Sequence, residues 1–216
     1  DALVARGQAF PCGCSRKEIT AAGRRGWEGP IYPGTCRRGL PGARAPRALR
    51  ACASTRYWEI DDAFLGAVAF DLKALGSDFV IRRADGIVAY QLATVADDLE
   101  LGVTRVVRGI DLLGSTARQL QLYQSLGAPA PTYAHHPVLV SAGGAKLAKA
   151  TGAAPIHLDR ARRELADTLE HIGLAPTDAR APAAPSAQLA EALTRLAGPP
   201  PGLAAYLPPT ATLPAD

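Results

Sequence analysis

Methionine is absent from the 216 residues of the chain. The initiator residue is therefore not among them, and the first six residues, DALVAR, have the composition of the interior of a helix. We expect from this that the chain has lost its true beginning.

Long apolar runs are also absent. No uninterrupted apolar stretch approaches the roughly 20 residues that a bilayer-spanning helix needs, and the start lacks the basic-then-apolar order of a signal peptide. We therefore expect a cytoplasmic protein without a membrane partner. With 48% hydrophobic and 20% charged residues, the composition is typical of a globular chain that forms one well-buried domain or two small ones.

Cysteine is scarce, and three of the four cysteines lie close together in the sequence, at positions 12, 14 and 36. In a reducing compartment such spacing favours metal ligation over disulfides, and a disulfide between Cys12 and Cys14 would close a small, strained ring. Three thiolates hold zinc tetrahedrally if a fourth donor is found; incidental buried thiols are the alternative. Cys52 has no spaced partner, so we expect it to be a small apolar residue.

The formal net charge of +4 is unevenly distributed. Residues 16–56 hold ten basic side chains against two acidic ones, a local net of +8, so the remainder sums to −4. Clustered guanidinium groups bind phosphates, which indicates a polyanion partner; a solvated, arginine-rich surface is the other explanation. The ten basic residues are Arg16, Lys17, Arg24, Arg25, Arg37, Arg38, Arg44, Arg47, Arg50 and Arg56.

The first part of the chain predicts an irregular module followed by a hairpin. Residues 10–56 are rich in Gly, Pro and Arg with few apolar pairs, so a metal would substitute there for a core. Residues 78–83 and 87–90 have the composition of strands and flank Asp85-Gly86, a dipeptide typical of a hairpin turn.

A parallel α/β layer is predicted next. Residues 104–108 form a strand, Thr116 to Gln119 has the form of a capping box that begins a helix, and Gly127 ends that helix. The apolar residues 138–140 then enter a glycine-rich loop. Strand, helix, strand and loop in this order are typical of such a layer.

Helices are predicted in the last part of the chain. Residues 158–172 have helical spacing and stop at Gly173, and Ser186 is placed to cap a second helix that runs to Leu196. The residues from Pro199 onward are proline-rich, and we expect a loosely ordered tail.

Two lysines three residues apart follow two glycines. Lys146 and Lys149 are two of only four lysines beside twenty arginines. Ammonium groups on a glycine-hinged loop suit a reaction in which negative charge builds on a phosphate, whereas an ordinary exposed loop is the plainer interpretation.

Other candidate side chains lie near the ends of predicted strands, where α/β folds place ligand contacts. Tyr90 and Arg108 have these positions, and an arginine there can clasp a carboxylate with two parallel hydrogen bonds; a structural aromatic and a surface ion pair are the alternatives. Asp97, Asp98 and Asp111 are acidic helix edges or metal or ribose contacts, and His135 and His136 are expected to be packing or hydrogen-bonding residues.

Six segments together resemble the glutamyl-Q tRNA(Asp) synthetases, relatives of glutamyl-tRNA synthetase, in order and spacing. The resemblance spans about residues 1–155. The segments are residues 11–16 (PCGCSR), 32–37 (YPGTCR), 78–86 (DFVIRRADG), 89–93 (AYQLA), 106–113 (VVRGIDLL) and 146–149 (KLAK).

This resemblance implies particular roles for the candidate residues. One structural zinc ion would be held by Cys12, Cys14, Tyr32 and Cys36, with the phenol as the uncommon fourth donor. Glutamate would contact Tyr90 and Arg108. Lys146 and Lys149 would belong to the class I signature loop, with Lys149 at ATP, which is used with magnesium.

The fold implied is α/β, the second half of a Rossmann-like class I synthetase catalytic domain with an inserted zinc-bearing subdomain and a short helical C-terminal region. The implied segments are residues 1–10, the end of the first Rossmann half; 11–86, the inserted zinc-bearing, acceptor-binding-like subdomain; 87–155, the second Rossmann half; 156–198, the helical region; and 199–216, the tail.

The activity implied is ATP-dependent activation of glutamate and transfer of the glutamyl group to queuosine in the anticodon of tRNA(Asp), by a monomer. The family's N-terminal His-Ile-Gly-His-type motif is not among these 216 residues, so we expect this chain alone to be inactive. Ala148 and Ala150 stand where the family usually has serine and glutamine. A fragment of a glutamyl-tRNA synthetase that charges tRNA(Glu), and a non-catalytic zinc and RNA-binding relic, are the alternatives.

Overall fold

The computed structural model describes residues 1–26, 29–54, 57–75, 77–140, 146–147, 152, 155–178 and 183–195. The chain divides into two compact units, residues 1–135 and 136–216, and each is described by itself. Helices and strands both contribute, so the fold is α/β. Within these described ranges, no helix combines the length and apolarity required to cross a membrane.

A three-stranded antiparallel sheet organises the first unit. Its order is β1 (Ala9–Cys12), β4 (Ala48–Ala51), β7 (Phe79–Arg82), with Phe10 opposite Arg50 and Arg50 opposite Val80. Strands β1 and β7 are thus brought together through β4, although about 70 residues separate them in sequence.

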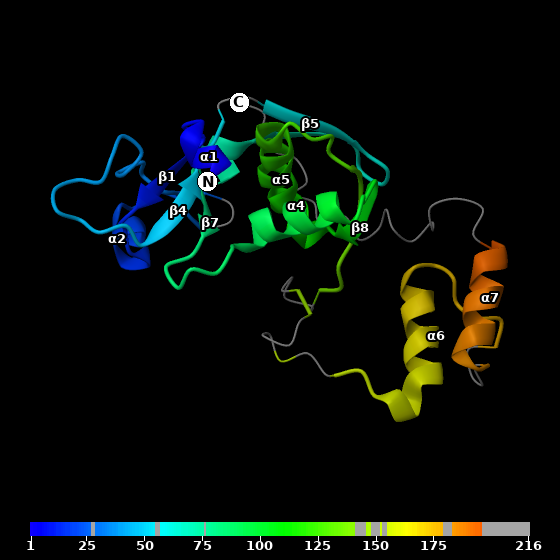
Figure 1. Ribbon diagram of the computed structural model, residues 1–216. Coiled ribbons are helices and arrows are strands. Elements are labelled where there is room, and N and C mark those ends of the chain that lie inside the picture. The colour runs from blue at the N-terminus through cyan, green and yellow to red at the C-terminus, as the bar shows by residue number, and fades with distance from the viewer. Residues whose placement is uncertain are drawn as a thin grey trace. The chain divides into compact units, whose positions relative to one another are not determined.

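The two faces of this sheet bury different side chains, because successive residues of a strand point to opposite faces. One face packs with the short helix α1 (Ala2–Ala5), with α4 (Tyr90–Glu100) and with α5 (Leu113–Leu126). The other packs with α2 (Arg16–Ala21), and Figure 1 shows α2 on the side of β7 away from α4 and α5. The first cluster comprises Leu3, Ala9, Ala51, Phe79, Ile81, Val95, Leu122 and Tyr123, and the second Phe10, Cys12, Ile19, Tyr32 and Cys36.

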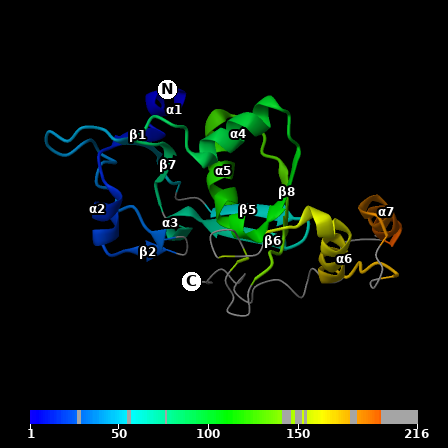
Figure 2. The same ribbon diagram turned by 90° about the horizontal axis from the view of Figure 1, so that it is seen from below.

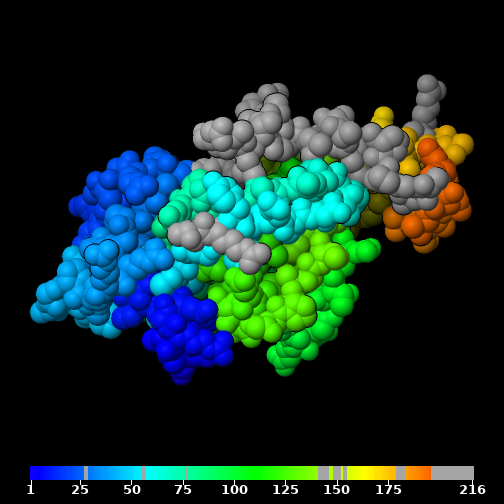
Figure 3. All heavy atoms as spheres, turned by 90° about the horizontal axis from the view of Figure 1, so that it is seen from above, coloured from blue at the N-terminus to red at the C-terminus, as the bar shows by residue number. Residues whose placement is uncertain are grey.

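Two hairpins extend the first unit. The short pair is β2 (Arg25–Gly26) and β3 (Gly29–Pro30), which directly precedes Ile31 and Tyr32 in the chain. The longer pair, β5 (Tyr57–Asp62) and β6 (Gly66–Asp71), leads into α3 (Leu72–Leu75). Figure 2 shows the longer hairpin extending along α5 toward β8. In Figure 3 it forms a cyan band beside the green surface of the segment that contains α4 and α5.

The predicted parallel layer exists, but its second strand lies elsewhere in the sequence. Strand β8 (Arg105–Gly109), a 3-10 turn η1 (Ile110–Leu112), α5 and β9 (Thr132–His136) follow one another. Strands β8 and β9 pair, and the contacts Arg105 to Thr132 and Arg108 to His135 share an offset of 27 residues, as parallel strands require. The prediction of this strand at residues 138–140 is wrong: Leu139 and Val140 are exposed, and only Val140 pairs, in an isolated bridge with Lys146.

The predicted hairpin is only half formed. Strand β7 confirms the prediction at residues 78–83, but residues 87–90 form no strand. Val88 makes an isolated bridge with Arg82, and Tyr90 begins α4. The reason is the helical spacing of Leu92, Val95 and Leu99, which places all three against the core of the first unit.

The predicted start of α5 is wrong by one turn. The helix begins at Leu113, and Thr116 caps nothing, since its fully buried hydroxyl contacts Arg108 and His135 instead. The predicted end is confirmed, because Gly127 has the left-handed conformation, with φ 72°, that ends many helices.

The second unit contains a helical pair. A 3-10 turn η3 (Leu158–Arg160) precedes α6 (Ala161–His171), and α7 is Pro185–Arg195. The two helices pack through Leu169, Leu174 and Ala192, which confirms both predicted helices. Ser186 does not cap α7, because Pro185 already occupies its first position, where its missing N–H is no loss. The predicted tail lies outside the described residues.

Candidate functional site

The Cys12-Gly13-Cys14 turn is held at both ends. Cys12 is the last residue of β1, and Ser15 caps α2 with a complete capping box. The Ser15 hydroxyl accepts a hydrogen bond from the Glu18 amide at 3.2 Å, and the Glu18 carboxylate accepts one from the Ser15 amide at 2.7 Å. The two thiols are therefore presented by a strand end and a helix start rather than by a loose loop.

Glycine is required between the two thiols. A Cβ at Gly13 would stand 2.5 Å from the Arg44 side chain and 2.8 Å from the Ala45 carbonyl oxygen. Only the close approach of this backbone lets residues 44–45 cover the turn.

The sulfur atoms of Cys12, Cys14 and Cys36 all lie within 4.8 Å of one another. Cys14 Sγ and Cys36 Sγ are 3.7 Å apart, and Tyr32 Oη lies 3.5 Å from Cys12 Sγ. Tetrahedral ligation at about 2.3 Å for sulfur and 2.0 Å for oxygen gives separations of about 3.8 and 3.5 Å. The arrangement thus fits a zinc-sized ion bound by three sulfurs and one oxygen.

Cys52 lies outside this group, as expected. Its thiol is 3.6 Å from the Gly7 carbonyl oxygen, and its side chain packs beside the apolar cluster around Phe10. Burial raises the pKa of the Cys52 thiol, which keeps it protonated.

The site shifts the acidities of its members in different directions. Burial acts to raise the pKa of Cys12, but contacts with Tyr32, the Cys14 backbone and Arg50 outweigh burial and leave that pKa below its usual value. Burial, and then the contact with Cys36, raises the pKa of Cys14. Burial and the contact with Cys12 raise the pKa of the Tyr32 phenol. Cys12 therefore loses its proton more readily than Cys14 does.

Arg108 is fixed by three hydrogen bonds. Its Nε donates to His135 Nε2 at 3.2 Å, Nη1 to Gln119 Oε1 at 2.8 Å, and Nη2 to Thr116 Oγ1 at 2.7 Å. The guanidinium also lies 5.3 Å from the centre of the Tyr133 ring. Among the residues that the structure describes, no further acceptor is found, so one N–H on each terminal nitrogen remains and the guanidinium presents two donors from a fixed position.

His135 connects Arg108 to a buried carboxylate. His135 Nδ1 lies 2.6 Å from Asp62 Oδ2, and neither side chain is exposed. Since Arg108 Nε donates to Nε2, the ring proton is assigned to Nδ1, which donates to Asp62. Burial acts to raise the pKa of Asp62, but the bonds from His135 and from the amides of Phe64 and Leu65 outweigh burial and lower that pKa.

Tyr90 and the lysines occupy different surroundings. The Tyr90 side chain is 52% exposed, and the next residue, Gln91, donates to Ser115 Oγ at 2.9 Å, which ties the start of α4 to α5. Tyr90, through its neighbour Gln91, and Arg108 are thus both connected to α5. Lys146 is exposed in the second unit, and Lys149 lies outside the described residues.

Sequence reasoning identified Arg108 and His135 but missed the residues that hold them. Asp62, Thr116 and Gln119 are buried polar side chains. A usable signal for Asp62 was its position before the turn of a hairpin, where aspartate accepts nearby amides. Thr116 and Gln119 were interpreted only as a capping box, because their spacing in the sequence matches that motif. Asp98, by contrast, lies on α4 as expected and accepts from Tyr123 Oη.

The fold agrees with a family comparison. Residues 1–174 match the model of the catalytic domain of class I tRNA synthetases (E and Q). The chain belongs to this family.

Individual relatives refine the comparison. The chain is 49% identical over 174 residues to a glutamyl-Q tRNA(Asp) synthetase of Chromobacterium violaceum, a match that covers 81% of this chain and 58% of that protein. It is 47% identical over 178 residues to one of Burkholderia cenocepacia, covering 80% and 60%. The chain therefore spans about three fifths of the length of these curated relatives.

A solved structure supports the fold. The glutamate-tRNA synthetase of Elizabethkingia anophelis matches with a TM-score of 0.56 at 24% identity, covering 70% of this chain and 34% of that one. At this identity the likeness concerns the fold alone.

Proposed function

We propose that this chain is part of an enzyme that activates glutamate with ATP and transfers the glutamyl group to queuosine in the anticodon of tRNA(Asp). The observation that carries the proposal is the 43–49% identity to several glutamyl-Q tRNA(Asp) synthetases, over most of this chain. In this proposal the first unit holds a zinc-bearing subdomain, residues 11–86, inserted into a Rossmann-like catalytic domain.

Zinc would be held by Cys12, Cys14, Tyr32 and Cys36. The separations of their donor atoms support this set. A closed four-ligand site supplies folding free energy rather than chemistry, and it would fix residues 12–36, which have little other core.

Glutamate would be held by Arg108, with Tyr90 contributing its exposed ring and hydroxyl. The support for Arg108 is its fixed guanidinium, which has two N–H groups that no described residue accepts from and that a carboxylate could accept. The activation of glutamate by ATP requires positioning and charge stabilisation, with no covalent enzyme intermediate. ATP, used with magnesium, would be met by Lys149 and Lys146, whose ammonium groups suit the charge that builds on phosphate.

RNA would contact the basic surface of residues 16–56. A cavity of about 350 Å³ supports this, since Arg16 of this surface lines it together with Arg118 of α5. Guanidinium groups at one hollow attract a phosphate backbone.

The test uses the enzyme expressed from its full reading frame, with radiolabelled glutamate, ATP and three RNAs: tRNA(Asp) with queuosine, tRNA(Asp) without it, and tRNA(Glu). We expect label on tRNA(Asp) that contains queuosine, none on tRNA(Asp) that lacks it, and pyrophosphate exchange that needs no tRNA. Label on tRNA(Glu) instead would replace the proposal with charging by a glutamyl-tRNA synthetase. Omitting ATP is the control, because the activated intermediate is an adenylate.

A further inference from the structure

The cysteine cluster has a charge that its own members do not balance. Three thiolates bound to a divalent ion leave one net negative charge, even when the phenol keeps its proton. Cys12 and Cys36 are completely buried. A buried charge without compensation is costly, so a positive group is needed close to the sulfurs.

Two arginines reach the cluster, and they are not equivalent. Arg44 Nη1 lies 3.6 Å from Cys14 Sγ, but this side chain is 34% exposed and forms an ion pair with Glu18 at 2.9 Å. Arg50 is only 9% exposed, and its Nε donates to Cys12 Sγ at 3.4 Å. Solvent and a carboxylate weaken the effect of Arg44, whereas Arg50 acts from inside the core.

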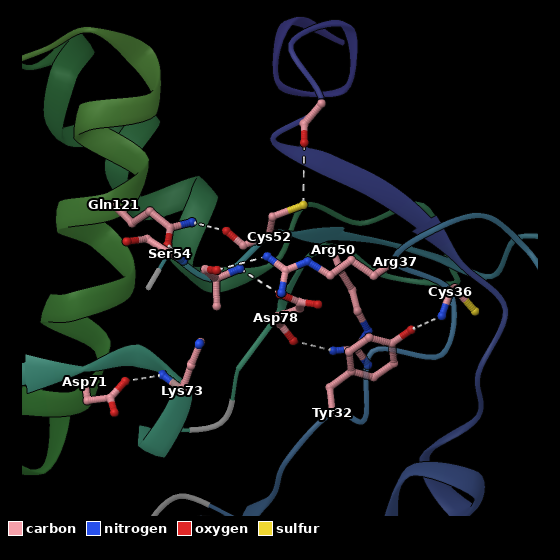
Figure 4. A network of polar contacts seen from close by, with 12 residues as sticks. Tyr32, Cys36, Arg37, Arg50, Cys52, Ser54, Asp71, Lys73, Asp78 and Gln121 are labelled. Atoms are coloured by element: carbon pink, nitrogen blue, oxygen red, sulfur yellow. Dashed lines mark hydrogen bonds and ion pairs between the residues drawn. The ribbon is translucent and has the colours of Figure 1, made fainter. Parts of the chain in front are cut away.

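Arg50 is held in place at three points. Besides the sulfur, its Nη1 donates to the Asp78 carbonyl oxygen at 2.9 Å, and its guanidinium carbon lies 4.1 Å from the centre of the Tyr32 ring. Figure 4 shows the Arg50 guanidinium against the ring of Tyr32 with Asp78 beside it. One planar group thus contacts two members of the cluster and the residue that precedes β7.

We propose that Arg50 is a positioning residue of the metal centre, which balances the cluster charge, fixes Cys12 Sγ and Tyr32 for ligation, and links the centre to β7. The inference rests on the zinc site proposed above. It assigns to one residue of β4 a role that the ligand set alone does not include. Lysine cannot replace it fully, because an ammonium group lacks the planar fork that meets all three contacts.

The test measures metal binding by the 216-residue chain. Zinc affinity is obtained by competition with a chromophoric chelator, for the wild type, Arg50→Met, Arg50→Lys and the control Arg47→Met, which removes an exposed arginine from the same segment. Loss of a group that supports a ligand typically weakens metal affinity about 10- to 100-fold. We expect that loss for Arg50→Met, a smaller loss of more than about twofold and up to about tenfold for Arg50→Lys, and no change beyond about twofold for Arg47→Met.

A spectroscopic readout separates positioning from general stability. With Co²⁺ in place of zinc, the sulfur-to-metal charge-transfer band reports the electron density on the thiolates. Removing the N–H donor and the positive charge beside Cys12 raises the energy of its sulfur electrons, so the band moves to lower energy in Arg50→Met and stays unchanged in Arg47→Met. A purely structural role would lower the unfolding midpoint without moving the band.

The outcomes are distinguishable. Wild-type protein that binds no zinc overturns the metal centre itself, and this inference with it. Wild-type protein that binds zinc, together with an Arg50→Met variant of equal affinity and unchanged band, overturns the role of Arg50 alone. If Arg50→Met does not fold, Arg50→Lys decides, since wild-type affinity and an unchanged band in that variant also overturn the role.

Discussion

Replacing Asp62 with asparagine tests the buried network that orients Arg108. Asparagine keeps an oxygen where Oδ1 accepts the amides of Phe64, Leu65 and His135. It places an NH₂ group where Oδ2 accepts from His135 Nδ1. The substitution therefore changes a single contact of the buried hairpin end.

The histidine has no neutral form that restores this contact. With its proton on Nδ1, His135 places an N–H donor against the NH₂ group of the introduced asparagine, which is also a donor. With its proton on Nε2, it faces Arg108 Nε, which also donates. A hydrogen bond to a charged group contributes about 1.5–3 kcal/mol, and an unsatisfied buried donor costs a similar amount. We expect a loss of about 3 kcal/mol in the free energy of unfolding, or roughly 10 °C in the thermal midpoint.

The assay is urea and thermal unfolding followed by circular dichroism at pH 7. Asp61→Asn is the matched control, because Asp61 is the exposed neighbour in the same strand. Equal midpoints for Asp62→Asn and Asp61→Asn would refute the assignment of the network.

The pH dependence of stability follows from the lowered pKa of Asp62. This pKa is lowered because the hydrogen bonds to the carboxylate outweigh the effect of burial. The folded state binds the proton less readily than the unfolded chain, whose aspartate pKa is about 3.9. The stabilisation is thus fully present above that pH and is lost as pH falls through the folded-state pKa. We expect the difference between wild type and Asp62→Asn to be constant above about pH 5 and to narrow below about pH 4.

Three further predictions concern the basic, cysteine-containing module. Gly13→Ala should lower the free energy of unfolding in urea by about 1–3 kcal/mol, because the added Cβ clashes with Arg44 and with the Ala45 carbonyl oxygen. Adding Arg44→Ala should restore only part of this loss, since the clash with the backbone oxygen remains. An unchanged unfolding midpoint in Gly13→Ala contradicts this packing. Removing zinc with a chelator should lower the free energy of unfolding by about 3 kcal/mol, if free zinc was 100-fold above Kd beforehand. We expect this loss in the wild type and in Cys52→Ser, whereas the stability of Cys36→Ser should not depend on zinc. Affinity for RNA should fall steeply with salt, and a flat response in a filter-binding titration would reject a phosphate-contacting surface.

Some features of this protein depend on residues close together in sequence, and these were predictable. The left-handed glycine that ends α5 and the helical spacing of α6 follow local rules. Cys12 and Cys14 are separated by one residue, so they are close together in any conformation. A shared metal site therefore required only that Cys36 lie near them, as it does. The resemblance named the residues of the proposed site because their motifs are short and continuous.

What the sequence by itself determined was therefore the family, the cysteine cluster, the end of α5 and the presence of α6 and α7. Only the tertiary structure decided that Tyr90 begins a helix, that β9 rather than residues 138–140 pairs with β8, and that Thr116 supports Arg108. The reason is the distance along the chain between partners: His135 lies 73 residues from Asp62, and Arg50 lies 38 residues from Cys12. A buried polar side chain is stable only with a partner, and no local pattern indicates which distant residue that partner is.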